Sequence, residues 1–373
     1  MSNEERFDMY SDTHDFLAEG LLVPFVNQTN NNRLQMFNSH VGQAIQLEQA
    51  EPPKVFTGFE NQIGEHSTGY NKVKGIWKVL KKIKKNEFNY ILIIRNEMTL
   101  EYDIVYRTEA ENLTEHFGYK LDNNVMDSIV EGEIIEDKIV SHDMNYDSDM
   151  NFQYGKNLNV AYLAFSGHTN EDSIVISEST ADKMSSYFVE KIDVNINTND
   201  VLLNIYGDEN KYKTFPSIGE KINEDGVLLA TRRIIYTDII SKLKDKLLSK
   251  YIDGDTRKYA HKGATVIDIN IYSNKDLNNL SQEPYNSQIL ENYFNLLRYY
   301  NEVVDYLKPI LFNKRSKFSN ELRTFYNKIA SFRDPLTEFE NSGRRFDNIV
   351  AEFTILYKKP LTPGSKLTNR YGI

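Results

Sequence analysis

The 373-residue chain contains no cysteine, which excludes disulfide bonds and cysteine-ligated zinc within it. It also has no apolar run near the roughly 20 residues that a membrane-spanning helix needs, so no membrane segment is expected. Residues 1–6 are charged and lack an apolar core, and they therefore predict no signal peptide. These absences fit a protein of the reducing cytoplasm.

Familiar catalytic motifs are also missing. The sequence has no Walker A loop, no HExxH pair and no nucleophile elbow. His66, His168 and His261 are too scattered to predict a metal site. The sequence alone thus gives no sign of a self-contained enzyme.

The charge balance argues against a freestanding nucleic-acid binder, because the formal net charge is -10. Positive charge is nevertheless concentrated in two regions, residues 72–85 and residues 344–370. The first holds seven lysines: Lys72, Lys74, Lys78, Lys81, Lys82, Lys84 and Lys85. Clustered surface lysines are more often solvated than ligand-bound, and we expect solvation for this cluster.

Hydrophobic periodicity predicts a β-rich α+β protein with a helical insertion. The expected strands are Leu21–Phe25, Lys54–Glu60, Tyr90–Ile94, Asp103–Tyr106, Asn159–Phe165, Ser173–Ile176, Thr265–Tyr272 and Ile349–Tyr357. The expected helices are Arg33–Gln46 and the long stretch Ser287–Phe332, which Pro309 should divide into two.

Two short segments carry the strongest chemical signal. In Asn170–Ser177 two adjacent carboxylates, Glu171 and Asp172, precede an apolar run. In Pro363–Gly372 one lysine and one arginine, Lys366 and Arg370, lie in a Pro/Gly-rich turn.

These two segments resemble active-site segments of the β (second-largest) subunit of multisubunit RNA polymerase. Further resemblances follow in the family's order along the chain. They are Leu22–Phe25 with Asn32, Arg33, Met36, Gln43 and Ala44; Pro53–Glu60, similar to P-L-V-x-T-G-M-E; Gly155–Tyr162 with Gly167–Ile174; and Gly263–Ser273, similar to the strand that closes the flap domain.

The family's N-terminal lobes and its C-terminal part have no counterpart here. The resemblance therefore implies the middle fragment of a split β subunit, as encoded by large (jumbo) bacteriophages, and the AT-rich style of the composition fits that source. The implied fold is half of a double-psi β-barrel with a β-flap domain and a helical insertion. The expected parts are a barrel and RNA-path segment at 1–72 and a β-rich segment that binds the RNA–DNA hybrid at 73–155. Barrel strands with the Glu-Asp pair follow at 156–200, and a flap-like domain with the helical insertion at 201–345. Residues 346–373 would return to the barrel and carry the Lys366 turn.

The resemblance also implies a role for each site residue. Lys366 would approach the RNA 3′ end and the α-phosphate, a task suited to a compact cation with three donors. Arg370 has two open roles, phosphate contact or bracing of its turn. Asp172, with Glu171 beside it, would lie near the second metal, and since extended neighbours point to opposite sides only one should face it. Along the RNA and NTP path the implied residues are Arg33, Asn32, Gln43 and Met36, with helix packing as the other role for Met36.

The implied cofactor is a pair of Mg²⁺ ions, held mainly by aspartates of a partner subunit. The implied partners are the remaining β parts, a β′-like largest subunit, a promoter-specificity factor at the flap, DNA template, RNA product and NTPs, with no membrane. The expected location is the cytoplasm of an infected bacterium, with packaging in the virion as another possibility.

The sequence also departs from the family's pattern. Ser365 stands at the family's aspartate position and Asn369 at a glycine position, and the family's Asn-Lys-Gly continuation does not follow Gly372. These departures favour a second hypothesis, a catalytically inactive β-like paralogue that docks on a host polymerase. A third, a single-chain polymerase, fails because no Asp-x-Asp-x-Asp string occurs.

Overall fold

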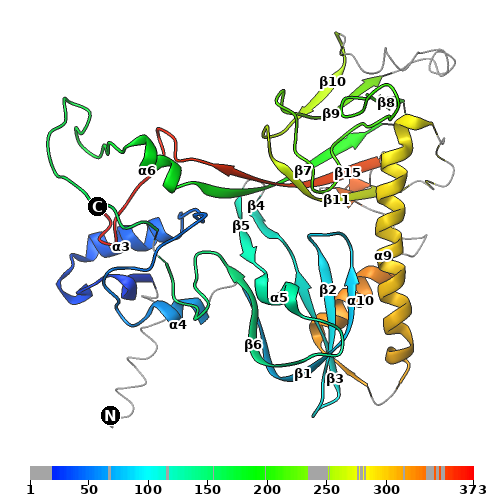
Figure 1. The fold of residues 1–373 in the computed structure, drawn as a ribbon, viewed down its shortest axis with the longest axis horizontal. Helices are drawn as coiled ribbons and strands as arrows, with labels where there is room; N and C mark the ends of the chain where they lie inside the picture. The colour runs from blue at the N-terminus through cyan, green and yellow to red at the C-terminus, as the bar shows by residue number, and fades with distance from the viewer. Residues whose placement is uncertain are drawn as a thin grey trace.

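In the computed structural model the strands form four sheets, and two of these sheets are spanned by one long helix (Figure 1). The structure describes residues 19–373, apart from 66–68, 115–116, 154, 198, 234–250, 252, 275–276, 278–279, 281–282, 314–315, 333–339, 342–343 and 346–348. A β-rich mixed α/β architecture is confirmed.

The largest sheet has seven strands in the order β12-β3-β2-β1-β6-β5-β4. Their bounds are β1 Tyr70–Lys84, β2 Tyr90–Asn96, β3 Glu101–Arg107, β4 Ala110–Thr114, β5 Phe117–Asp122, β6 Ile134–Asp143 and β12 Lys317–Phe318. A second sheet, β11-β15-β7, contains β7 Ser186–Ile196, β11 Thr265–Ser273 and β15 Ile349–Lys359. The small sheets are β10-β9-β8, with β8 Asp200–Leu202, β9 Val227–Arg233 and β10 Thr256–Tyr259, and β13 Glu340–Asn341 with β14 Arg344–Arg345.

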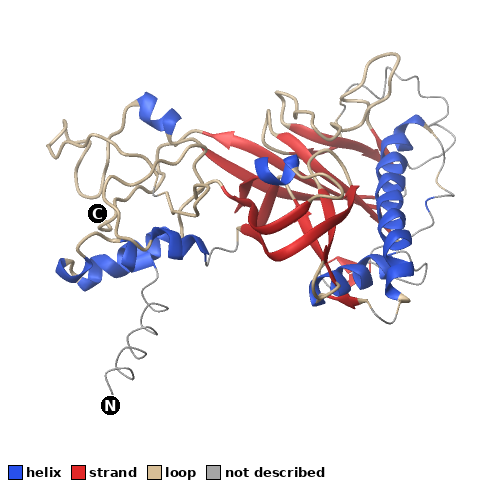
Figure 2. Ribbon diagram, turned by 60° about the horizontal axis from the view of Figure 1, so that its bottom comes forward, coloured by secondary structure: helices blue, strands red, loops and turns tan. Residues whose placement is uncertain are grey.

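The helices lie against these sheets and in a loop-rich region apart from them (Figure 2). Their bounds are η1 Glu19–Leu22, η2 Val26–Gln28, α3 Asn31–Val41, α4 Glu60–Glu65, α5 Asn124–Ser128, α6 Glu178–Lys183, η4 Pro284–Asn286, α9 Ser287–Leu311 and α10 Asn320–Phe332. No helix among the described residues is both long enough and apolar enough to cross a membrane.

Strand β2 lies between β1 and β3 in the seven-stranded sheet and is covered on both faces. Its residues Tyr90–Ile94 are all buried. Because side chains alternate along a strand, Leu92 and Ile94 pack on one face with β1, α5 and β6, while Ile91 and Ile93 pack on the other with α9 and α10. A continuous apolar run is typical of such doubly covered strands, and the buried strand predicted there is confirmed.

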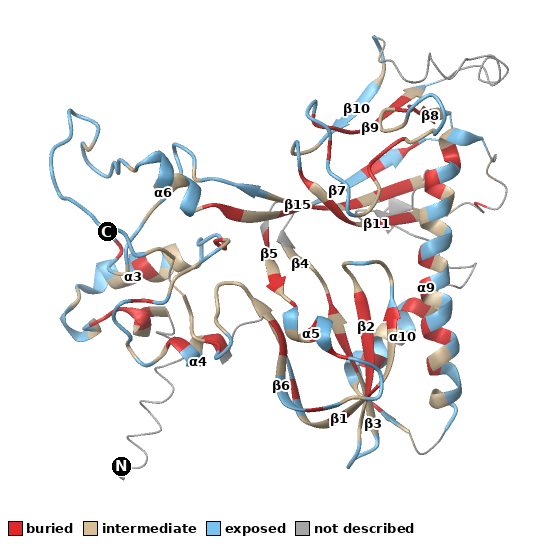
Figure 3. Ribbon diagram, viewed as in Figure 1, coloured by how far each residue is buried: buried red, intermediate tan, exposed pale blue. Residues whose placement is uncertain are grey.

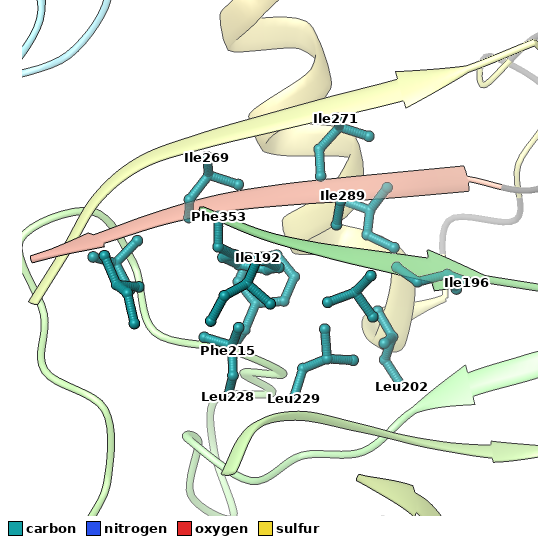
Figure 4. Close-up of a cluster of buried hydrophobic side chains, with 14 of the residues drawn as sticks. Ile192, Ile196, Leu202, Phe215, Leu228, Leu229, Ile269, Ile271, Ile289 and Phe353 are labelled. Carbon is teal, nitrogen blue, oxygen red and sulfur yellow. The ribbon is translucent and has the colours of Figure 1, made fainter. Parts of the chain in front are cut away.

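Helix α9 connects the two main cores. Its 25 residues span about 37 Å. Near its start Ile289 packs with β7, β11 and β15 in the core that Figure 4 shows, around Phe215 and Phe353. Further along, Val303 and Leu307 pack against the β2 sheet. The helix thus holds both sheets on one rigid element.

The helical insertion divides at a different place from the one predicted. Pro309 lies inside α9, in its last turn, and the break falls between Leu311 and Asn320. Proline so near the end of a helix disturbs only the final hydrogen bonds, whereas apolar contacts hold the preceding turns. The predicted division into two helices is right, but its position at Pro309 is wrong.

Strands β7 and β15 form a long antiparallel arm. They pair along all eleven residues of each strand, from Ile196↔Ile349 to Ser186↔Lys359. At the second end both strands enter a region that consists mostly of loops (Figure 2). We call this region the site lobe and define it as residues 19–65, 155–185 and 360–373.

The strands predicted for the site lobe are wrong. Leu21–Phe25 is a 3₁₀ turn and a bend, Lys54–Glu60 is irregular until α4 begins, and Asn159–Phe165 and Ser173–Ile176 are loop. Apolar runs predict burial, but a strand also needs a neighbouring strand to satisfy its backbone groups. Among the described residues, no strand pairs with any of these segments. The helix predicted over Arg33–Gln46 is confirmed only as far as Val41, where α3 ends before Gly42.

The remaining predicted strands are confirmed. Asp103–Tyr106 lies in β3, Thr265–Tyr272 in β11 and Ile349–Tyr357 in β15. Most residues of β11 are buried, because α9 and β15 pack against it.

The contact of α9 with the β2 sheet can be tested at Leu307, whose side chain is fully buried. Leu307→Ala should lower the free energy of unfolding of this half by about 2–5 kcal/mol, since it leaves a cavity between helix and sheet. Urea unfolding followed by fluorescence of Trp77, the chain's one tryptophan, measures this sheet directly. Lys308→Ala, at an exposed neighbour, is the matched control. Equal midpoints for the two variants would contradict the bridging role of α9.

Candidate active site

The turn 360–373 lies against α3, so that segments more than 300 residues apart in sequence meet. The Lys366 Nζ donates to Gln43 Oε1 at 3.2 Å. The Arg33 guanidinium donates to the carbonyl oxygen of Gly372 at 3.1 Å. A third contact joins His40 Nδ1 and Thr368 Oγ1 at 3.3 Å. Three of the predicted site residues, Lys366, Gln43 and Arg33, are therefore brought together by the fold.

Local sequence explains why α3 presents this face. Asn30 caps the helix by accepting from the Asn32 backbone N–H at 2.8 Å. Phe37 is the buried residue of α3, whereas Arg33 and Met36 are exposed on its surface. Met36 is 44% exposed, and its sulfur lies 3.6 Å from an Arg33 nitrogen.

Gly372 allows the close approach of the turn to α3. Its φ is +69°, in the region that favours glycine. A Cβ atom there would lie 2.7 Å from the Arg33 carbonyl oxygen and 3.1 Å from the Phe37 nitrogen. Any larger residue would push the Lys366 turn away from the helix.

Arg370 is enclosed in the same lobe. Its guanidinium donates to the carbonyl oxygen of Leu22 at 3.0 Å and to that of Val55 at 2.5 Å. It also lies 3.7 Å from the carboxylate of Glu60, and its own side chain is 17% exposed. Of the two roles open for Arg370, this geometry supports bracing of the turn.

Glu171 and Asp172 lie in a turn of the loop 157–176. Every residue from 157 to 175 except Thr169 is exposed, as Figure 3 shows along the loop that leads to α6. Glu171 has a φ of +53°, so the pair is not extended as predicted. Within the described part of the chain no hydrogen bond or ion pair holds either carboxylate.

The loop is fastened at both ends. At its start Glu51 accepts from the Asn157 backbone N–H at 3.0 Å and pairs with Lys156 at 3.1 Å. At its far end α6 follows, and the Leu361 N–H donates to the Ala181 carbonyl oxygen at 3.2 Å. The loop that carries Glu171 and Asp172 and the turn that carries Lys366 are therefore joined where α6 meets Leu361. Among the described residues, Lys366 makes no contact with either carboxylate.

Two structurally important residues escaped sequence reasoning. Gln46 uses its side-chain amide to pair with the backbone of Lys120 at 2.6 and 2.7 Å, and it donates to Asp143 at 2.5 Å. Glu60 holds the Thr57 backbone N–H at 2.8 Å. The Thr57-x-x-Glu60 spacing was a readable signal because it is that of a capping box, whereas Gln46 gave none.

The seven lysines of residues 72–85 do not form one binding patch. Lys85 pairs with Asp268 at 2.5 Å, and Lys81 lies 3.5 Å from Glu131. Lys82 extends over the ring of Tyr90 at 4.1 Å from the centroid. The cluster is thus divided among separate structural contacts.

Comparison with known proteins gives a consistent result. The sequence model of the family described as RNA polymerase Rpb2, domain 6, matches residues 114–372. Among curated proteins, the DNA-directed RNA polymerase subunit beta of Carsonella ruddii is 26% identical over 232 residues, which cover 60% of this chain and 17% of that protein. The subunit of the same name from Solidesulfovibrio magneticus is 26% identical over 229 residues, 59% of this chain and 16% of that protein. The one from Rhodopirellula baltica is 25% identical over 202 residues, 54% and 15% respectively. The chain thus spans only about a sixth of the length of these relatives.

Asp143, at the end of β6, accepts a hydrogen bond from Gln46 of the site lobe. Its carboxyl group predicts a dependence of stability on pH. Burial raises the pKa of Asp143 above its ordinary value, against hydrogen bonds from Asn145 and Gln46. The folded state therefore binds a proton more tightly than the unfolded state. The contribution of this group to stability is full below about pH 4 and is lost as pH rises through the raised pKa.

Asp143→Asn keeps the Oδ1 acceptor and removes the charge. At neutral pH it should be more stable than the wild type, and its unfolding midpoint should fall less between about pH 4 and 7. Thermal unfolding across this range measures the effect. Asp149→Asn, at an exposed position of the same loop, should follow the wild-type curve. Parallel curves for all three proteins would contradict the assignment.

Proposed function

Because the family match covers more than half of its length, the chain belongs to the family of RNA polymerase Rpb2, domain 6, and we propose that it is part of a DNA-dependent RNA polymerase β subunit. Its activity would be template-directed nucleotidyl transfer within a complex. The observation that carries the proposal is the contact of Lys366 with Gln43, which joins two segments that each resemble the family's active centre.

In this function Lys366 places a cation beside the reacting phosphate. The Lys366 side chain is exposed, and its one hydrogen bond to a described residue is with the neutral side-chain amide of Gln43, so the amine can turn toward an incoming nucleotide. The RNA and the NTP would lie along α3. They would contact Asn32 and Arg33 at its start and Gln43 just beyond its end. A fixed cation aimed at developing charge is the usual means of stabilising phosphoryl transfer.

The Mg²⁺ ions of the proposed reaction would be bound mainly by a partner subunit. The described residues hold no group of three histidine or carboxylate side chains that could bind a metal ion. The two Mg²⁺ ions of the reaction would therefore be held mainly by a β′-like largest subunit, and they would activate the attacking and leaving oxygens. Asp172 and Glu171 would lie near the second ion.

The exposed loop 157–176 supports assembly with other polymerase parts. It carries seven large apolar side chains that are each at least 41% exposed: Leu158, Val160, Tyr162, Leu163, Phe165, Ile174 and Val175. Apolar residues gathered so densely on one exposed segment mark an interaction surface. We propose that the remaining β parts supply strands that pair with this loop and complete a double-psi barrel.

The finer source and partners are part of the same proposal. The chain would be a fragment of a split, phage-encoded subunit that acts in the cytoplasm of the infected cell or in the virion. A promoter-specificity factor would bind at the flap, formed by the part with β8, β9 and β10. The alternative is an inactive β-like paralogue that docks on a host polymerase, and the replacements Ser365 and Asn369 favour it.

Lys366→Ala separates these two functions. In the purified complex it should lower the rate of nucleotide addition by at least about 100-fold, because a cation at the reaction centre is lost. Assembly should be unchanged, and Lys328→Ala, at an exposed lysine on α10, should keep full activity. An assembled Lys366→Ala complex with wild-type rates would exclude the catalytic role and favour the paralogue.

The apolar loop is tested by assembly, not by catalysis. Replacing Leu163 and Phe165 by serine should change the stability of the chain itself by less than about 0.5 kcal/mol, because both side chains are exposed. Copurification with the other polymerase subunits should weaken by at least about tenfold. Phe312→Ser, at a 77% exposed position after α9, is the matched control. Normal assembly of the double variant would refute the docking role.

A further inference from the structure

Glu60 is a buried carboxylate directly behind the Lys366 turn. Its residue is 2% exposed. It accepts hydrogen bonds from the Thr57 and Gly58 backbone N–H groups at 2.8 and 2.9 Å, and from the Thr57 hydroxyl at 3.1 Å. A carboxylate so enclosed is stable only where hydrogen bonds and an opposite charge compensate for lost water.

Arg370 supplies that opposite charge from the other end of the chain. Its guanidinium lies 3.7 Å from a Glu60 oxygen. The same group donates to the carbonyl oxygens of Leu22 and Val55, which belong to two further segments of the site lobe. A planar guanidinium with several fixed donors can hold three partners in one geometry, which lysine cannot.

Arg370 is only four residues from Lys366. If its guanidinium turned away from Leu22 and Val55, the turn between the two residues would lose one of its anchors, and the Lys366 amine would be free to move away from Gln43. The carboxylate of Glu60 holds the guanidinium in place by charge, and it holds the Thr57–Gly58 backbone by hydrogen bonds. Glu60 thus connects the loop that precedes α4 to the turn that bears Lys366.

We infer that Glu60 is a positioning residue, which acts through Arg370 to set the place of Lys366 against α3. Its effect on catalysis rests on the proposed function, while its effect on the turn does not. Neither the family match nor the names of the relatives assigns a role to this residue.

Hydrogen–deuterium exchange on the full chain tests the positioning directly. Glu60→Gln should speed the exchange of amides in residues 361–373 by at least about tenfold, because the anchor of the turn is weakened. Exchange in β7 and β15 should be unchanged. Arg370→Ala should speed exchange of the same amides at least as much, because it also loses the contacts with Leu22 and Val55. Adding Glu60→Gln to Arg370→Ala should speed exchange in residues 361–373 little further, since Glu60 acts on this turn through Arg370.

The matched control is another acid–arginine pair with little exposure, in a different part of the described chain. Asp255 and Arg232 are 1% and 12% exposed and are joined by two contacts of 2.8 Å. Asp255→Asn should loosen β8, β9 and β10 and leave residues 361–373 as in the wild type. If Glu60→Gln leaves the turn unchanged, or loosens every element equally, the inference is wrong. Arg370→Lys keeps the positive charge but loses the planar set of guanidinium donors. It tests the same contact if the Glu60→Gln chain does not fold.

The kinetics of nucleotide addition in the assembled complex distinguish a positioning role from a purely structural one. Glu60→Gln should lower kcat for nucleotide addition by about tenfold with little change in KM for the NTP, because Lys366 is displaced without loss of the binding surface. A rise in KM at constant kcat would overturn the inference. Failure of the wild-type complex to make RNA would refute the proposed function instead, and the exchange experiment would still decide on Glu60.

Discussion

The ladder between β7 and β15 is the interaction on which the site lobe depends. An antiparallel pair brings the end of one strand beside the beginning of the other. Here it sets Lys359 beside Ser186, so the turn 360–373 and the segment 155–185 start from the same place. The contact between Leu361 and Ala181 continues this pairing into α6. Backbone hydrogen bonds alone therefore bring residues more than 170 positions apart in sequence into one lobe.

The orientation of that arm is set by contacts between the two main sheets. Helix α9 packs on both, and a polar network fills the space between their edges. Lys85 at the end of β1 contacts Asp268 at 2.5 Å and Asn270 at 2.7 Å on β11. Asn270 continues the network to Glu352 on β15. Partly buried ion pairs of this kind add little net stability, and the contribution of this network is to join β1 to β11 and β15.

Sequence reasoning succeeded where burial and pairing both lie within the chain. The runs Tyr90–Ile94 and Ile349–Tyr357 have neighbouring strands and covering helices, and both are strands. It failed at Asn159–Phe165, whose residues are all exposed, because an apolar run by itself does not supply the neighbouring strand that a ladder needs. The resemblance implied one active centre for Lys366, Gln43 and Arg33, and the fold brings the Lys366 turn against α3. The link from Glu60 to Arg370 spans 310 positions and depends on tertiary packing, so no local pattern could reveal its partner.

The two halves of the candidate site differ in how firmly they are held. The Lys366 turn is fixed by Arg370, by Gly372 against α3 and by the arm, so its geometry is set within this chain. The Glu171–Asp172 loop is fastened only at its ends, with apolar side chains exposed between them. Ordering such a loop costs conformational entropy, which burial of those side chains against a partner can offset. In the proposed function the lysine side is preorganised and the acidic side is completed by assembly. A chain with this division would hold phosphate-directed charge ready while it stays inactive until the metal-binding subunit and the loop come together.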